Sequence, residues 1–260
     1  MNKIFKVVSI IITILAVLLM ILPFSYVIKE GIAFVFDIPY SKEINFAFGL
    51  SMRSSIISSL LCMVCTLSIV HVMNLHKRLK NIVEYIFSLP LGVPHLVSGI
   101  ALITFFGRNN FGGFLSRFGI DFVYTTSGVM LAQFFVNLPY CVKTYSTAYD
   151  LIDKKLLFCA RSLGLSEWKV FMYVNLPMMK RQIFSIWMIC WARALGEFGA
   201  IMMLVGVTRM KTETLATSIF LNMSTGDFDI AAGVSVILIG VSMITMYIFQ
   251  RLMGKGDVNA

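Results

Sequence analysis

Charged residues are scarce in this chain of 260 residues, because Asp, Glu, Lys and Arg together make up only 13% of it. That is about half the share found in soluble globular domains. Hydrophobic residues make up 58%, and the mean hydropathy is +0.85. A chain of this size has too little interior to bury so much apolar surface, which excludes an ordinary soluble domain and intrinsic disorder. We therefore expect lipid to be the solvent for much of the chain.

Cysteine and histidine are also few, with five and three residues. None of the cysteines falls in an expected outside loop, so a disulfide framework is excluded. Cys62 and Cys65 have the spacing of a redox or metal pair, but they lie within a predicted membrane helix and no second pair completes a metal site. We interpret them as small residues that pack between helices. The scattered histidines predict no metal site.

Acidic residues are outnumbered, 13 against 22 Lys and Arg, which gives a net charge of +9. In a soluble protein such an excess would suggest nucleic acid. In a membrane protein it marks cytoplasmic loops, which collect Lys and Arg. The charge therefore predicts membrane topology and no nucleic-acid partner.

Six long apolar stretches are each long enough to cross a hydrocarbon core of about 30 Å as a helix. Solidly apolar runs exclude barrel strands, which would alternate in polarity. The sequence predicts an all-α polytopic membrane protein, one transmembrane domain over residues 1–260, with six transmembrane helices at about 7–28, 54–75, 85–107, 122–148, 182–207 and 230–250.

The basic residues orient these helices. With the N-terminus inside, thirteen Lys and Arg fall in cytoplasmic segments and seven in outer ones, while Lys143 and Arg193 lie at or within helices. The cluster Lys77, Arg78 and Lys80 after the second helix is the strongest single indication. The positive-inside rule therefore favours both termini on the cytoplasmic side.

The loop at 149–181 has 33 residues on the expected cytoplasmic side and is patterned rather than featureless. Gly164 predicts a helix stop, Ser166 is expected to cap a second short helix, and Leu176-Pro177 is expected to end it. Apolar residues form a stripe on each helix: Leu156, Leu157, Ala160 and Leu163 on the first, and Trp168, Phe171 and Met172 on the second. Such a hairpin suggests docking into a groove of a cytoplasmic partner. A hairpin lying on the inner leaflet would explain the pattern equally well.

This loop resembles the EAA signature of ATP-binding cassette (ABC) importer permeases, which reads Glu-Ala-Ala, three residues, Gly, nine residues, Ile-x-Leu-Pro. Residues 160–168 are close to the family's usual sequence around that signature. The positions that correspond to its coupling loop are Ala160, Arg161, Gly164, Trp168, Val174, Leu176 and Pro177. Phe158 and Cys159 depart from Glu and Ala, so no ionic role of that Glu is carried over.

Three further blocks are similar to permeases of the oxyanion branch. Residues 89–102 resemble their third-helix motif, and residues 128–139 resemble their fourth. Residues 192–200, Ala-Arg-Ala-Leu-Gly-Glu-Phe-Gly-Ala, resemble the fifth-helix motif of permeases for molybdate, tungstate and sulfate. The resemblance covers about residues 85–250.

The resemblance implies a type I ABC importer permease fold and a set of partners. The loop at 149–181 would be the coupling helix that sits in a cleft of a cytoplasmic ABC ATPase dimer. The chain has no Gly-x-x-x-x-Gly-Lys-[Ser/Thr] phosphate loop, so ATP and Mg would be bound by that ATPase, with no cofactor on this chain. The other expected partners are a second permease copy in a homodimer and an extracytoplasmic oxyanion-binding protein.

Arg193 and Glu197 lie within the fifth predicted helix. Mid-membrane charge costs about 2.5–3.5 kcal/mol on insertion scales, so such residues face a bundle interior or a cavity. Their i,i+4 spacing predicts a pair on one helix face, which would either line and gate a pathway or lock helix packing. Direct substrate binding by Arg193 is a further alternative, although pathway sites must be weak.

Small residues and prolines complete the candidate pathway. Pro90 and Pro94 are expected to kink the third helix. Gly99, Gly196 and Gly199 are expected to let helices approach closely. The candidate pathway or gate residues are thus Pro94, Gly99, Arg193, Gly196, Glu197 and Gly199.

The leading hypothesis is the permease subunit of an ABC importer for a tetrahedral oxyanion, with molybdate or tungstate ahead of sulfate or thiosulfate. It is not an enzyme by itself, and its place would be the bacterial or archaeal cytoplasmic membrane. An ion-coupled secondary transporter is the alternative of another class. That alternative predicts more charges within the helices and inverted repeats, neither of which is evident.

Overall fold

The computed structural model describes residues 3–36 and 41–253, and over these ranges every regular element is helical, which confirms the all-α expectation. The elements in chain order are α1 (Lys3–Val35), α2 (Lys42–Leu75), α3 (Lys77–Ser88), the 3₁₀ turn η2 (Leu89–Gly92), α4 (His95–Phe106), α5 (Phe111–Ser116), α6 (Thr126–Asp150), α7 (Lys154–Ser162), α8 (Glu167–Val170), the π-helical turn η3 (Phe171–Asn175), α9 (Leu176–Met178), α10 (Lys180–Leu195), α11 (Gly199–Val205), α12 (Leu215–Thr225) and α13 (Phe228–Met253).

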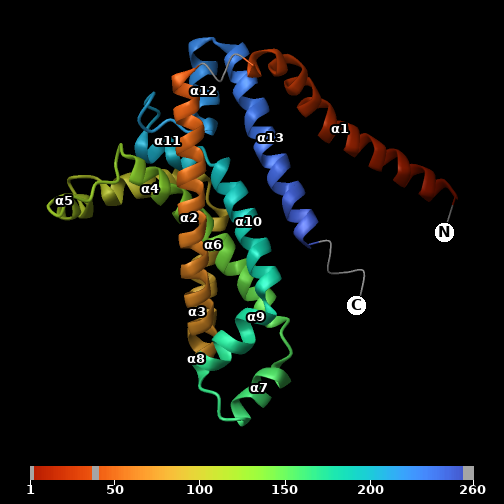
Figure 1. The fold of residues 1–260 in the computed structure, drawn as a ribbon, viewed down its shortest axis with the longest axis vertical. Coiled ribbons are helices and arrows are strands. Elements are labelled where there is room, and N and C mark those ends of the chain that lie inside the picture. Colours follow the sequence, from red (N-terminus) through yellow and green to blue (C-terminus); the bar gives the residue numbers. More distant parts are fainter. Residues whose placement is uncertain (1–2, 37–40, 254–260) are drawn as a thin grey trace.

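A bundle of α2, α6 and α10 forms the centre of the molecule, with α7, α8 and α9 at one end and α12 at the other (Figure 1). One side of α2 carries a row of fully buried small hydroxyl side chains: Ser51, Ser54, Ser55, Ser58 and Ser59. Two tryptophans of α10 donate to this row, Trp191 Nε1 to Ser55 Oγ at 2.8 Å and Trp187 Nε1 to Ser59 Oγ at 3.1 Å. Small side chains let α6 and α10 pack closely on α2.

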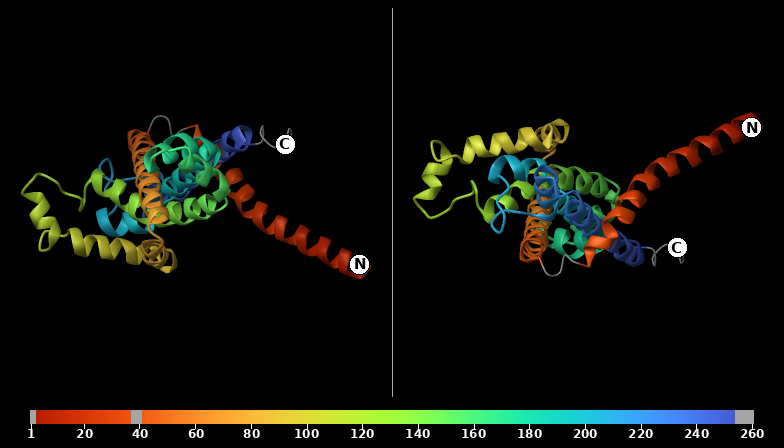
Figure 2. Two further views of the ribbon diagram at one scale, coloured as in Figure 1. Left: turned by 90° about the horizontal axis from the view of Figure 1, so that it is seen from below. Right: turned by 90° about the horizontal axis from the view of Figure 1, so that it is seen from above.

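Two parts of the chain project from this bundle. α1 leaves it on one side, and the α4–α5 segment extends on the opposite side (Figure 2). The most apolar part of α1 has none of its residues buried, whereas 39% of the corresponding window of α2 is buried. In an aqueous environment such a helix would be strongly unfavourable, so its exposed surface is consistent with a lipid or protein neighbour.

Three helices of the described chain are long and apolar enough to cross a membrane, and the number rises to five if two bent helix pairs each count as one span. The expected span that this count leaves out, 122–148, corresponds to α6, whose 25 residues include the buried polar side chains of Gln133, Asn137 and Ser146. These polar groups face the bundle and lower the apolar character of the helix. The count of six and the orientation therefore remain predictions.

Several helix bounds differ from the expected spans, and a charged residue explains the first difference. α2 begins at Lys42 and not near residue 54, because the exposed Arg53 lies within the helix instead of ending it. The expected span 85–107 is two helices, α3 and α4, which meet at 111°. The break lies at η2 and Pro94, where the two prolines of this segment predicted a kink.

The expected span 182–207 is also interrupted. α10 ends at Leu195, α11 begins at Gly199, and the two axes meet at 56°. This break turns the chain beside α4 and α6, and α11 then packs on both of them in a cluster that includes Leu102, Ala132, Ile201 and Leu204. The break therefore positions the residues described next.

Candidate functional site

A cavity of about 390 Å³ lies beside the α10–α11 break. Four segments contribute to its walls: the start of α4, the middle of α6, the end of α10 and the start of α11. The residues that line it are His95, Asn137, Ala192, Arg193, Gly196, Glu197, Phe198 and Gly199. Three of these carry ionisable side chains, so the cavity is the polar centre of an otherwise apolar region.

Arg193 is held from the α6 side. Its Nε donates to Asn137 Oδ1 at 3.3 Å, and its guanidinium carbon lies 4.8 Å from the centre of the Tyr140 ring. A cation over an aromatic face is attracted by the ring quadrupole. Asn137 is itself buried and donates through Nδ2 to the Gln133 carbonyl at 2.9 Å. The guanidinium is thus fixed in position.

Glu197 lies in the break and is 4% exposed. Its Oε2 lies 2.7 Å from His95 Nδ1, and its Oε1 accepts the backbone N–H of Ala200 at 2.9 Å. A buried carboxylate is tolerated where both oxygens have partners. Glu197 therefore joins the start of α4 to the start of α11.

The expected Arg193–Glu197 pair is not formed, and this prediction was wrong. In the part of the chain that the structure describes, no ion pair joins these two side chains, and Glu197 pairs with His95 instead. The reason is the end of α10 at Leu195, with Gly196 in a non-helical conformation at φ −88° and ψ 2°. The i,i+4 spacing puts two residues on one face only where the helix is continuous.

The side chains of Gln133 and Glu197 add hydrogen bonds to the backbone at the break, where the Ala194 carbonyl also accepts the backbone N–H of Glu197 at 3.3 Å. A helix end frees carbonyl groups, and a helix start frees N–H groups. Gln133 Nε2 of α6 donates to the Ala194 carbonyl at 2.9 Å, and Glu197 accepts the N–H of Ala200. The interruption of the helix is therefore stabilised by specific side chains.

Of the other candidate pathway residues, two line the same cavity and two belong to the start of α4. Pro94 caps the start of α4, one residue before His95. Gly196 and Gly199 flank the break and line the cavity. Gly99 lies at the α4–α11 crossing, where a Cβ atom would come within 2.6 Å of Met203 Cβ and 2.8 Å of the Ala200 carbonyl oxygen. Only glycine allows the two helices to approach this closely.

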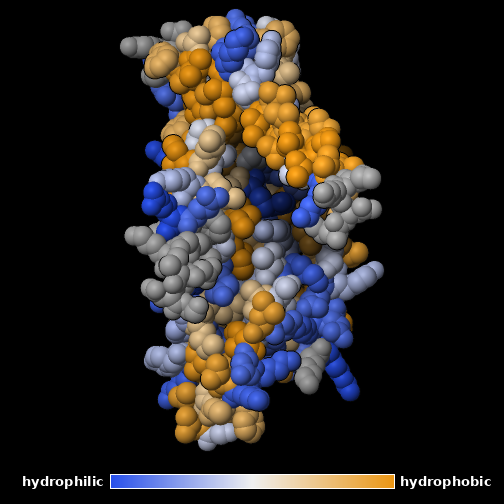
Figure 3. Space-filling view, turned by 90° about the vertical axis from the view of Figure 1, so that its right-hand side faces the viewer, coloured by the Kyte–Doolittle hydropathy of each residue, from blue (hydrophilic) through white to orange (hydrophobic). Residues whose placement is uncertain are grey.

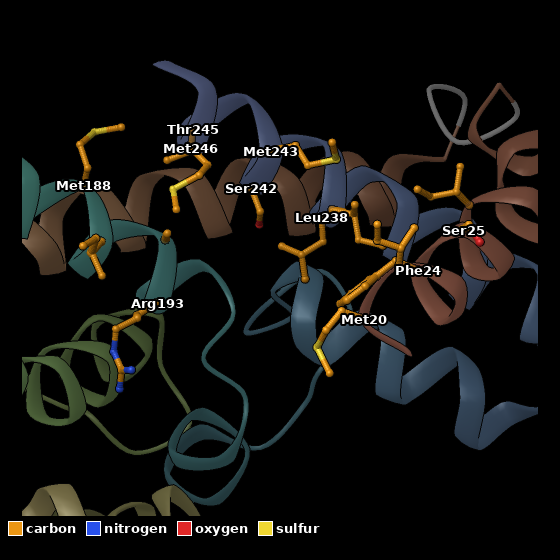
Figure 4. Close-up of a pocket in the computed structure, with 15 residues that line it drawn as sticks. Met20, Phe24, Ser25, Met188, Arg193, Leu238, Ser242, Met243, Thr245 and Met246 are labelled. Carbon is orange, nitrogen blue, oxygen red and sulfur yellow. The ribbon is translucent and has the colours of Figure 1, made fainter. Parts of the chain in front are cut away.

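A second, larger cavity of about 850 Å³ lies between α1, α10 and α13, and Ala192 and Arg193 border it as well. Its walls are mostly methionine and aliphatic side chains, including Met20, Met188, Met243 and Met246. On this side of the molecule hydrophobic residues overhang a hollow (Figure 3). Figure 4 shows Arg193 pointing away from the methionines. The guanidinium group thus lies on the side of the smaller, polar cavity.

The loop at 149–181 forms a second candidate site at the end of the bundle. α7 begins after Asp153, whose side chain accepts the N–H of Lys155 at 2.9 Å, and the chain turns at Gly164, where φ is +82°. This left-handed conformation favours glycine. The predicted helix stop is therefore confirmed in position.

The structure differs from the predicted hairpin in two details. Ser166 takes the expected N-cap position of α8, but its side chain makes no capping hydrogen bond. Leu176 does not end the second helix, because it is helical at φ −60° and ψ −45° and opens α9. Pro177 sits in the first turn of α9, where the missing N–H costs nothing, and the wider π-turn η3 precedes it. The chain thus stays helical from α8 almost to α10.

The loop divides its apolar residues between the bundle and the outside. Ala160 and Phe171 are buried, and Val174 is partly buried against the same core cluster. Trp168 is 62% exposed, and large apolar side chains near it are exposed as well: Leu156, Phe158, Leu163 and Tyr173. The predicted apolar stripes are therefore only partly exposed: Leu156, Leu163 and Trp168 lie on the open surface, whereas the buried members pack on the bundle.

Polar contacts tie the loop to itself and to the bundle. Arg161 and Glu167 form a two-point ion pair across the turn, with Nε to Oε1 at 2.7 Å and Nη2 to Oε2 at 3.1 Å. The hydrogen bonds that Arg161 donates to the Glu167 carboxylate raise the pKa of Arg161 above its usual value. Asn175 Nδ2 donates to the Tyr149 hydroxyl at 3.1 Å in a buried contact. The His71 ring of α2 lies 4.4 Å from that of Phe171. Movement of the loop would therefore reach α2 and α6 directly.

A comparison with protein-family models matches residues 63–255 to the binding-protein-dependent transport system inner membrane component. The chain belongs to this family. The match covers the last part of α2 and all of α3 to α13, including the loop at 149–181 and the α10–α11 break, and it excludes α1 and residues 42–62 of α2.

Relatives of this chain include proteins named for molybdenum transport and for sulfate transport. The molybdenum transport system permease protein ModB of Mycobacterium tuberculosis is 33% identical over 202 residues, which are 77% of this chain and 76% of ModB. The sulfate transport system permease protein CysT of Escherichia coli is 23% identical over 244 residues, 92% of this chain and 88% of CysT. The chain is therefore an inner-membrane permease subunit and not itself a catalyst.

A permease chain in the crystal structure of a bacterial alginate ABC transporter, in complex with an alginate-bound periplasmic protein, matches this fold. The TM-score is 0.75 at 16% identity, covering 95% of this chain and 93% of that one. At this identity the match shows the fold alone, which is that of ABC transporter permeases.

The site residues missed by sequence reasoning are His95, Asn137 and Gln133. In the sequence, His95 is one of three scattered histidines, and the two amides lie within the block of residues 128–139. Their common feature is that each meets the α10–α11 break from another helix. A sequence signal existed, since Gln133 and Asn137 are i,i+4 polar residues in an apolar helix, and such residues usually face a bundle interior.

Proposed function

We propose that this chain forms the pathway for a tetrahedral oxyanion in an ABC importer, with molybdate or tungstate ahead of sulfate. The observation that carries this proposal is the cationic side chain at the polar cavity beside the α10–α11 break. The Glu197 carboxylate is paired with His95, whereas among the described residues Arg193 forms no ion pair. The cavity thus has a positive charge to offer a passing anion. Relatives named for molybdenum and for sulfate transport support the same substrate class.

The coupling loop supplies the second half of the proposal. Its exposed apolar surface around Trp168 and Leu163 would dock in a cleft of a cytoplasmic ATPase dimer, which would bind ATP and Mg. Buried contacts from Phe171 and Asn175 to α2 and α6 would then carry closure of the ATPase into the bundle. Phe158, 68% exposed, would make an apolar contact where related permeases have Glu.

The proposed assembly contains two copies of this chain and an extracytoplasmic binding protein. The single domain would have six spans and both termini in the cytoplasm. Two observations support this orientation. The basic α3 lies at the same end as the loop, with Lys80 Nζ 2.6 Å from Asp150 Oδ1, and Arg78 is exposed beside it. Basic residues gathered at one end favour that end as the cytoplasmic one.

Transport by the reconstituted complex tests this function. The permease, its ATPase and its binding protein in lipid vesicles are expected to accumulate molybdate and tungstate and to hydrolyse ATP faster in their presence. Stimulation by sulfate but not by molybdate or tungstate would reverse the ranking. Uptake by the permease alone, without the ATPase, would favour the ion-coupled alternative.

A further inference from the structure

The polar cavity brings two nitrogen-bearing side chains from different helices to one hollow. Arg193 enters from α10, and His95 enters from α4. His95 Nδ1 donates to Glu197 Oε2, so Nε2 is the ring nitrogen left for a ligand, and in the protonated imidazolium form it carries an N–H that can donate to an oxyanion. The His95 side chain is 44% exposed, which keeps that nitrogen accessible.

The Arg193 guanidinium also has N–H donors that no described residue accepts. Its Nε is used by Asn137, whereas Nη1 and Nη2 have no hydrogen-bond partner within the described ranges. Two terminal N–H groups in a planar fork match two oxygens of a tetrahedral oxyanion. Asn137 has both polar atoms engaged, Oδ1 with Arg193 and Nδ2 with the Gln133 carbonyl, so it positions the guanidinium and does not contact the ion.

The nearby carboxylate sets the strength of such a site. Glu197 lines the same cavity, and its negative charge opposes an anion held by Arg193 and His95. A pathway site must bind strongly enough to admit the ion and weakly enough to release it. The cavity of about 390 Å³ is also large enough for an oxyanion that keeps part of its water.

We propose that Arg193 and His95 form a weak, transient binding site for a partly hydrated tetrahedral oxyanion inside the permease. Asn137 positions Arg193, and Glu197 both positions His95 and weakens the site. This inference rests on the proposed function and adds to it the residues that meet the substrate between the binding protein and the cytoplasm.

A thiol placed in the cavity reports on the site. In the full complex, Cys159→Ser removes the exposed native thiol, and Gly196→Cys adds a thiol at a position where a Cβ atom meets nothing closer than 4.0 Å. Labelling rates are measured with small thiol reagents of negative and positive charge. We expect the anionic reagent to react about tenfold faster, the preference to vanish in the added variant Arg193→Gln, and millimolar tungstate to slow labelling.

The matched control is Gly92→Cys in the same background, since Gly92 is exposed, outside the cavity, and has no atom within 4 Å of its Cβ position. Its labelling should show no dependence on tungstate or on Arg193→Gln. Glu197→Gln keeps the size of the side chain and one of its two acceptor oxygens and removes the opposing charge, so protection at Gly196→Cys should need severalfold less tungstate. A merely structural role of Glu197 would not tighten binding.

Transport separates this proposal from the proposed function. If the unaltered complex transports an oxyanion while Arg193→Gln and His95→Gln transport it equally well and tungstate protects nothing, the site is wrong and the function stands. If the unaltered complex transports none of molybdate, tungstate and sulfate, both the binding site and the proposed function are wrong. Slower transport in both variants, with partial rescue by Arg193→Lys and loss of protection, supports the site.

Discussion

The loop at 149–181 and the α10–α11 break both interrupt a helical chain, but they are built from opposite kinds of contact. In the loop, the turn follows from neighbours in sequence: Asp153 caps α7, Gly164 takes a left-handed conformation, and Arg161 pairs with Glu167 six residues later. At the break, the partners come from far away, with 61 residues between Gln133 and Ala194 and 56 between Asn137 and Arg193.

The two regions also differ in solvent exposure, and exposure decides how much their polar contacts contribute to the free energy of unfolding. The Arg161–Glu167 pair is nearly half exposed on both sides, whereas Glu197 is 3% exposed in its side chain. An exposed ion pair contributes about 0–1 kcal/mol, and a lost buried polar contact costs more. The loop therefore tolerates polar substitutions that the break does not.

Glu197→Ala should have the largest effect. It removes the partner of His95 Nδ1 and of the Ala200 N–H, so we expect about 3 kcal/mol of lost stability and abolished transport. Thermal unfolding of the purified complex and vesicle uptake would measure both. The matched control is Glu167→Ala, the exposed acid of the loop, which should cost less than about 1 kcal/mol. Equal losses would remove the contrast between the two regions.

Gly99→Ala should have the second-largest effect on stability and transport. The new methyl group would lie within 3.0 Å of Met203 Cβ and of the Ala200 backbone, so α4 and α11 must separate at a cost of about 2 kcal/mol. Transport should fall with stability, as read by unfolding in detergent and by uptake. The control is Gly49→Ala in α2, which meets no atom within 4 Å and should be neutral or slightly stabilising. A neutral Gly99→Ala would argue against a tight α4–α11 crossing.

Gly164→Val should uncouple the loop from transport. A Cβ atom at Gly164 meets nothing within 4 Å, so the penalty is only the left-handed backbone, about 1–2 kcal/mol for a branched residue. We expect normal membrane insertion, retained ATP hydrolysis and reduced uptake. Gly164→Asn is the control because asparagine tolerates this conformation. If the valine variant transports normally, the turn is not part of coupling.

Arg161→Gln should have the smallest effect. It breaks a surface ion pair and should lower stability by less than about 1 kcal/mol, with the difference shrinking as salt is added. Unfolding temperatures in low and high salt would show this. A large loss that salt does not reduce would mean that Arg161 contacts the ATPase or another buried group.

Local signals in the sequence predicted much of this fold. Apolar runs located α1, α2, α6, α10 and α13 to within a few residues at most ends, and Gly164 located the loop turn. The prolines of residues 89–94 predicted the α3–α4 break. α12 was missed, because its capping box of Thr214 and Thr217 lies in a short segment without a long apolar run.

The site could be predicted only in part. Arg193, Gly196, Glu197 and Gly199 do gather at one cavity with Pro94 nearby, but the partner of Glu197 was wrong. Helical periodicity assumes a continuous helix, and nothing in the spacing of Arg193 and Glu197 shows that α10 stops between them. The stop is stabilised by Gln133, 61 residues from the carbonyl it satisfies.

The sequence by itself determined that this protein is helical, lies in a membrane and has a patterned loop at 149–181, because hydropathy, proline and glycine act over a few neighbouring residues. Its motifs carry the resemblance to the permease family. Only the tertiary structure decided which charges meet. His95 and Glu197 pair because α4 turns back at 111° and α10 breaks at 56°, and Arg193 is left with a positive charge at the cavity because its expected partner is bound elsewhere. Such pairings depend on contacts between distant segments, which no local pattern encodes.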